Sequence, residues 1–137
     1  MALHMEHHMS VHKIDIVRIR NIYIYLIKKG RKMNNVFLIG NLTKNPDISY
    51  TTSNDPLCVA KFTVAVNEGY GDKQRTDYIS CVAFGRTAEN IERFLAKGKK
   101  VAVSGRIQTG SYEKDGHKVY TTDVIAERVE FLGGLSE

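Results

Sequence analysis

The stretch Thr76–Gly85, TDYISCVAFG, has the alternating pattern of a β-strand. Successive side chains of a β-strand point to opposite faces, so a strand here has two different faces. One face is apolar and suits a core, with the side chains of Ile79, Cys81 and Ala83. The other face has an aromatic ring near each end and smaller side chains between them: Tyr78, Ser80, Val82 and Phe84. Exposed rings spread over a sheet face are typical of a stacking platform for single-stranded nucleic acid, although a core also uses such rings.

The charge of the chain is distributed unevenly. Its 137 residues suit one domain with a core of its own, and its formal net charge is +5. Residues 1–32 carry seven Lys and Arg against two Asp and Glu, whereas residues 33–137 carry thirteen of each sign. The larger segment is therefore neutral, and any basic footprint for a polyanion must come from the arrangement of its charges.

Residues 1–32 form a leader that differs in composition from the rest of the chain. The segment is rich in Met and His at its start, and its apolar run Ile22–Ile27 is too short to span a bilayer. It has no small-residue cleavage site, which argues against a secretory signal. The histidines could bind a metal as a cluster, but a tag or translated upstream sequence is favoured. We expect this leader to be disordered and Met33 to be the natural start.

From Met33 onward, the pattern predicts strands, one helix and a frayed end at residues 133–137. The strands are expected at Asn35–Leu42, Ile48–Thr52, Leu57–Asn67, Thr76–Gly85, Lys99–Tyr112 and Val119–Leu132. The helix is expected at Arg86–Lys97, with Thr87 as its N-cap and Gly98 as its stop signal. Asp115-Gly116 predicts a hairpin turn between the last two strands.

This order of elements predicts an all-β domain over residues 33–132 with one short helix. A helix between the third and fourth strands of a five-stranded Greek-key barrel is the arrangement of the OB-fold. A small β-sandwich is the alternative, because a strand pattern alone does not distinguish the two.

Four segments together resemble the bacterial single-stranded DNA-binding protein family. They are MNNVFLIGNLTKNPDISYT, KFTVAVNEGYGD, TDYISCVAFGRTAENIERFLAKGKKVAVSGRIQTGSY and VYTTDVIAERVEFL, and they cover Met33 to about Leu132. The resemblance implies an OB-fold, binding of single-stranded DNA without strong sequence preference, and no catalysis. It also implies a homotetramer in the cytoplasm, associated with the nucleoid, that protects DNA during replication, recombination and repair.

The resemblance also implies which residues contact DNA. The family's base-stacking aromatic positions fall on Tyr70, Tyr78, Phe84 and Tyr112, of which the three tyrosines are often Trp in relatives. Cations near these rings are the candidates for phosphate contacts: Lys73, Arg75, Arg86, Lys97, Lys99, Arg106 and Lys114, with Lys44 weaker. The alternatives are structural: an exposed loop tyrosine at position 70, half-buried sheet rings at 78 and 84, a strand edge at 112, and a solvated helix end at Lys97 and Lys99.

The family departs from this chain at the C-terminal end. Its members usually continue into a long flexible tail whose acidic, apolar tip recruits replication and repair enzymes, whereas this sequence stops at Glu137. Recruitment of such enzymes is therefore expected only if the native protein has a tail that this sequence lacks.

An enzyme is the rival class of protein. Cys58 and Cys81 lie in apolar strand segments, which suits inert core thiols in a reducing cytoplasm better than nucleophiles. We find no metal-ligand spacing and no Gly-rich phosphate loop, and expect no cofactor, no metal and no membrane partner. A protein-interaction module on the same barrel is a further alternative, which loss of the aromatic platform would favour.

Overall fold

The computed structural model describes residues 17–30 and 32–132, so the predictions for residues 1–16 and for the frayed end at 133–137 lie outside the described residues. The chain divides into two compact units, Met1–Met33 and Asn34–Glu137. In the first unit, residues 17–28 are helical, whereas the sequence predicts a disordered leader. No Gly or Pro interrupts these twelve residues, so nothing within them breaks a helix.

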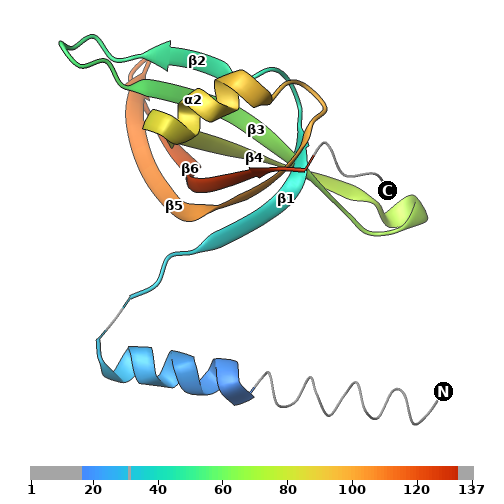
Figure 1. Ribbon diagram of the computed structural model, residues 1–137. Helices are drawn as coiled ribbons and strands as arrows, with labels where there is room; N and C mark the ends of the chain where they lie inside the picture. Colours follow the sequence, from blue (N-terminus) through green and yellow to red (C-terminus); the bar gives the residue numbers. More distant parts are fainter. Residues whose placement is uncertain (1–16, 31, 133–137) are drawn as a thin grey trace. The chain divides into compact units, whose positions relative to one another are not determined.

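The second unit is built mainly from strands, as Figure 1 shows. In chain order they are β1 (Val36–Leu42), β2 (Asp47–Tyr50), β3 (Cys58–Glu68), β4 (Arg75–Phe84), β5 (Lys100–Lys114) and β6 (His117–Phe131). Each overlaps a predicted strand. A 3-10 helix, η1 (Gly71–Lys73), lies between β3 and β4, and α2 (Gly85–Phe94) follows β4. Among the described residues, no helix is long and apolar enough to cross a membrane.

The strands form one sheet in the order β1-β5-β6-β4-β3-β2, and an additional pairing of β1 with β3 closes five of them into a ring. The closing contact is short and pairs Asn41 with Ala65 and Leu42 with Val64. At Gly40, an added Cβ would collide with the carbonyl oxygen of Ala65. A glycine is therefore needed for β1 to approach β3 closely enough to close the ring.

The core lies inside this ring and follows the predicted alternation. The buried side chains of β3 and β4 are Cys58, Ala60, Phe62, Val64, Cys81 and Ala83. Ala88 and Ile91 of α2 and Leu95 just after it pack into the same cluster. The other parity of both strands therefore points away from the core, which leaves it available for a ligand.

The helix differs from its prediction at both ends. Its N-cap is Phe84, whose side chain makes no capping hydrogen bond, so Thr87 is not the cap. The helix stops at Phe94, three residues before Lys97, and the Leu95 N–H donates to the Ile91 carbonyl at 2.9 Å. Phe94 is exposed, and its ring lies 5.5 Å from that of Phe131. The backbone is extended at the next residue, Leu95, whose side chain is buried in the core.

The hairpin between β5 and β6 matches its prediction. Lys114 pairs with His117 across a two-residue loop in which both Asp115 and Gly116 have positive φ, at 52° and 78°. This is the geometry that Asp-Gly favours in tight hairpins. The turn fixes the register of the two long strands, in which Tyr112 pairs with Val119.

Candidate nucleic-acid interface

The outward parity of β4 presents two separated rings. Tyr78 is 69% exposed and Phe84 is 45% exposed, whereas Cys81 and Ala83, of opposite parity, are buried. The two rings are six residues apart on one face, which is about 20 Å along an extended strand. The prediction that this strand has one aromatic, exposed face and one core face is confirmed.

Strand β3 leaves these rings uncovered. The residues that pair with Tyr78 and Phe84 are Ala65 and Val59, and side chains paired in this way lie on the same face. Ala65 is too small to cover a tyrosine ring. Between the rings, Ser80 pairs with Thr63 and Val82 pairs with Lys61. The outward face is therefore shallow at its centre and carries polar groups there.

Tyr70 is held at an exposed corner of the loop between β3 and β4. Tyr70 is 92% exposed and is the N-cap residue of η1, where its carbonyl accepts from the Lys73 N–H at 3.0 Å. Figure 1 shows this loop extending beyond the sheet. The loop places Lys73, a predicted phosphate contact, one helical turn from the ring.

Tyr112 lies on the same outward face as Arg106, on β5. The side chain of Tyr112 is about half exposed, and Arg106 donates to the Gln108 Oε1 at 3.2 Å. In the β5–β6 register, Arg106 pairs with Ile125 and Gln108 with Asp123. Because Val82 of β4 pairs with Ile125, the outward residues of β5 continue onto the face that carries Tyr78 and Phe84.

The predicted phosphate contacts fall into separate groups. Lys99 lies in a loop that packs on the end of β1 and the β1–β2 connection. There Asn41 of β1 donates to the Gly98 carbonyl, and Asn45 of the connection accepts from the Lys97 N–H. Lys97, Lys99 and Lys44 therefore share one corner of the second unit. Lys114 lies at the end of the β5–β6 hairpin, and Arg86 lies in the first turn of α2.

Arg75 already pairs with a carboxylate. Its guanidinium lies 3.1 Å from the Asp77 carboxylate, and both side chains are largely exposed. An exposed pair of this kind is weak, so a phosphate can replace the carboxylate at small cost.

Several residues on this face were not predicted from the sequence. The pairing of strands that are distant in sequence is what brings three of them onto the outward face: Lys61, Thr63 and Asp123. Tyr120 was also missed; it is exposed, and the Lys118 Nζ lies 5.6 Å from the centre of its ring. Tyr120 pairs with Ser111, so it lies on the opposite face of the hairpin from Tyr112.

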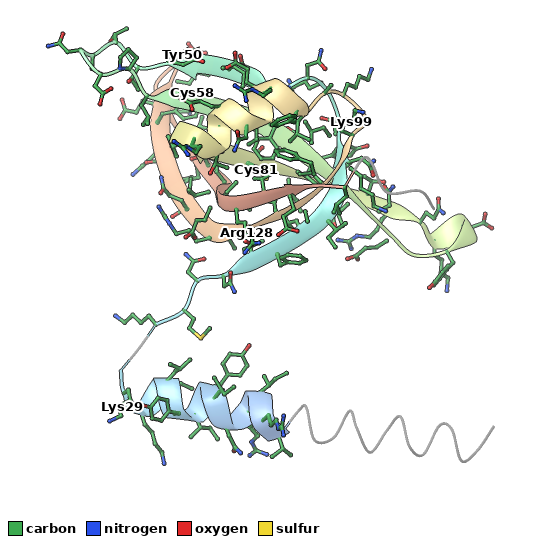
Figure 2. The ribbon with its side chains drawn as sticks, in the orientation of Figure 1. Lys29, Tyr50, Cys58, Cys81, Lys99 and Arg128 are labelled. Carbon is green, nitrogen blue, oxygen red and sulfur yellow. The ribbon has the colours of Figure 1, made fainter. Side chains whose placement is uncertain are left out.

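The two thiols are buried and free. Burial raises the pKa of Cys81 to about 12, and the nearby Asp123 charge acts in the same direction. Figure 2 shows Cys58 beside Tyr50, and both contact the Glu92 Oε2, at 3.9 Å from the Cys58 Sγ and 3.0 Å from the Tyr50 hydroxyl. The hydrogen bond to Glu92 raises the pKa of Tyr50 to about 12. The contacts of Tyr50 and Cys58 with Glu92 connect α2 to β2 and β3, which is a structural role. Cys81 stays protonated near neutral pH.

The described residues contain no group of three or more His, Cys, Asp or Glu side chains that could hold a metal ion. The outward face instead combines exposed aromatic rings, hydroxyls and cations, the groups with which proteins contact the bases and backbone of nucleic acids.

Comparison with known proteins agrees with this geometry. A single-stranded DNA-binding protein of Clostridium perfringens is 48% identical over 101 residues, which are 73% of this chain and 66% of that protein. One of Bacillus cereus is 46% identical over 104 residues, 73% of this chain and 60% of that protein. The chain therefore spans about two thirds or less of the length of these relatives. A model of the single-strand binding protein family matches residues 33–132, and the chain belongs to that family.

Proposed function

We propose that residues 33–132 bind single-stranded DNA without strong sequence preference, and that bases stack on Tyr70, Tyr78, Phe84 and Tyr112. The observation that carries the proposal is the pair of exposed rings on β4, which the paired residues of β3 leave exposed. Stacking on such rings tolerates any sequence because every base has a π-face. The relatives named as single-stranded DNA-binding proteins support the same ligand.

The phosphates of the strand are proposed to meet the cations around these rings: Lys73, Arg75, Arg86, Lys97, Lys99, Arg106 and Lys114. Arg106 is the best placed, because it lies on the outward face itself. Arg75 must first leave Asp77, and it contributes less. Lys44 gains support from its place in the corner that also holds Lys97 and Lys99.

The fold and the biological role follow from the same proposal. The ring of β1, β5, β6, β4 and β3, with α2 between β4 and β5, supports a five-stranded OB-fold barrel. Proteins of the family bind DNA and are not enzymes, as the sequence analysis expects for this chain. We assign it a role in protecting single-stranded DNA during replication, recombination and repair, in the cytoplasm and at the nucleoid. Recruitment of other enzymes would require an acidic tail in the native protein.

A homotetramer is proposed as the assembled state. Strand β1 pairs with β5 along Val36–Asn41 but with β3 only at Asn41 and Leu42, so one edge of residues 36–40 has no strand partner among the described residues. Phe37 is 66% exposed beside this edge, in a hollow that is also lined by Ala102 and Arg128. Pairing of this edge with a second copy would cover both the open backbone groups and the ring.

Titration with oligo-dT tests the proposed binding. The intrinsic tyrosine fluorescence of the protein should be quenched in a saturable way, and the anisotropy of a labelled oligo-dT should rise with the same Kd. Affinity should fall with increasing salt because phosphate contacts release counterions. Equal affinity for a duplex of the same length, or no binding to oligo-dT at low salt, would contradict the proposal.

A further inference from the structure

The helix at residues 17–28, the leader helix, has one apolar face. Five residues recur along it at the spacing i, i+3, i+4, i+7 and i+8, which places them on one side of a helix: Ile19, Ile22, Tyr23, Leu26 and Ile27. All of them except the half-buried Leu26 are exposed. A helix of this length is marginally stable alone in water, and most helices in proteins are stabilised by the packing of such a face. The leader helix therefore has an apolar face that is open to a partner.

The charges around this face are all positive. Residues 17–32 contain six Lys and Arg and no Asp or Glu. At about 100° per residue, Arg18 and Lys29 lie along one border of the apolar face and Arg20 lies along the other. Lys29, which Figure 2 shows at the end of the helix, continues the helical hydrogen bonding, because its N–H donates to the Tyr25 carbonyl at 3.1 Å. Cations in such positions can lay their stems on an apolar surface and keep their charged ends in water.

Three kinds of partner differ in what they offer to this helix. A second copy of the leader helix would cover the apolar face, but it would bring another segment with six positive and no negative charges beside the first. The phosphates of a nucleic acid would neutralise the charges and leave the apolar face uncovered. A bilayer with anionic lipids offers both kinds of group, since negative headgroups lie above an apolar interior. It is the partner that fits this combination of charge and apolar surface.

We propose that the leader helix binds the surface of a bilayer that contains anionic lipids. The helix lies in the plane of the interface, with Ile22 and Leu26 toward the acyl chains and the cations among the headgroups. Tyr23 belongs to the same face, and tyrosine favours the interface between a bilayer and water. A helix of this length reaches about 18 Å, whereas the hydrocarbon core is about 30 Å thick, so it does not span.

This partner differs from the expectation of no membrane partner. The apolar run Ile22–Ile27 is too short to span a bilayer, but a helix that lies on the surface needs no such length. A chain held in this way would keep residues 33–132 near the membrane, which is a property separate from the binding of DNA.

Flotation of the full chain with lipid vesicles tests the proposal. The chain should float with vesicles of equal parts phosphatidylglycerol and phosphatidylcholine, and less of it should float with phosphatidylcholine alone or at high salt. Ile22→Glu places a charge in the middle of the apolar face and should lower the partition coefficient for the mixed vesicles by about tenfold or more. Asn21→Glu is the matched control, because it adds the same charge on the opposite side of the helix. Glu favours a helix at least as well as Ile or Asn, so neither change removes the helix by propensity.

The alternatives give different results. Ile27→Glu, on the same face, should reproduce the loss seen with Ile22→Glu. Equal losses for Ile22→Glu and Asn21→Glu, equal flotation with phosphatidylcholine alone, or no flotation with the mixed vesicles at low salt would each overturn the proposal. If a second copy covers the face, the parent should not float, and Ile22→Glu should lower the molar mass measured by light scattering without vesicles.

The Kd for oligo-dT separates this proposal from the proposed function. Neither Ile22→Glu nor Asn21→Glu should change that Kd at moderate salt. An equal rise in the Kd with both variants, together with no flotation, would assign the leader helix to nucleic acid. A parent protein that floats with the mixed vesicles but does not bind oligo-dT would contradict the proposed function and support the membrane-binding helix.

Discussion

Replacing Tyr78 by Ala separates the aromatic face from the core. The side chain is 69% exposed, so only about a third of it is covered by protein. A covered tyrosine buries about 150–250 Å². A third of that area, at about 25 cal/mol per Å², gives a stability loss of about 1–2 kcal/mol. Phe62, which is 3% exposed on the adjacent strand, is the contrasting case, because Phe62→Ala should cost about 3–5 kcal/mol.

The same substitution should weaken binding of DNA much more than it weakens the fold. A base that stacks on one ring contributes about 1–3 kcal/mol, so the Kd for oligo-dT should rise by about 5- to 150-fold. The dependence of the Kd on salt should barely change, because no phosphate contact is lost. Tyr78→Phe is the matched control, since it keeps the ring and should bind nearly as tightly as the parent.

The assay combines anisotropy titrations at several salt concentrations with urea unfolding of the free protein. If Tyr78→Ala is destabilised as much as Phe62→Ala, the ring belongs to the core and the reasoning from its exposure is wrong. If the variant remains folded and binds oligo-dT with the affinity of the parent, the outward face of β4 is not the binding face. A protein-interaction module would then be the better interpretation of the platform.

Four other perturbations test separate parts of the description. Arg106→Ala should reduce the log–log salt slope of oligo-dT binding by about 0.7, and an unchanged slope would remove Arg106 from the phosphate contacts. Deleting residues 1–32 should leave thermal stability and oligo-dT affinity at moderate salt nearly unchanged, so a large loss of folding would show that the leader is part of the folded unit. Light scattering at micromolar protein should give four chains, and Phe37→Glu should lower that number, whereas a parent monomer with full DNA affinity would contradict the tetramer. The pKa of Cys81 is raised from 9.0 to about 12, so the folded state keeps a proton that the unfolded state loses, and stability should fall as pH rises from about 9 to 12. Urea unfolding at pH 8 and pH 11 should show a smaller fall for Cys81→Ala, and an equal fall in both proteins would assign the effect to other groups.

Local patterns predicted the strands because a strand of this sheet has a core face and a solvent face. In β4 this alternation separates Cys81 and Ala83 from Tyr78 and Phe84 without any knowledge of the neighbouring strands. The hairpin turn at Asp115 was predictable for the same reason, since the turn needs two residues with positive φ and Asp-Gly supplies them. Such features depend on residues within a few positions of one another.

Features that depend on distant pairing could not be predicted in this way. Lys61 and Asp123 are 62 residues apart, and only the registers of β3, β4 and β6 place them around one hollow. The end of α2 at Phe94 was not predicted either, because the chain becomes extended at Leu95, whose side chain packs into a core formed by distant strands. The helix at residues 17–28 was missed for another reason: disorder was expected because the composition of the leader differs from that of the rest, and such a difference does not exclude a local helix.

The side chain of Asn34 extends the sheet beyond the first residue of β1. Its amide nitrogen donates to the Ile107 carbonyl at 2.7 Å, and its amide oxygen accepts from the Ile107 N–H at 2.8 Å. A side chain thus imitates one further main-chain pairing between β1 and β5. Ends of strands open first, and an open amide exchanges its hydrogen with solvent. The exchange rate of the Ile107 amide hydrogen therefore reports on whether the Asn34 side chain is in place. The last hydrogen bonds at this end of the β1–β5 pair are made by a side chain and not by the main chain of β1.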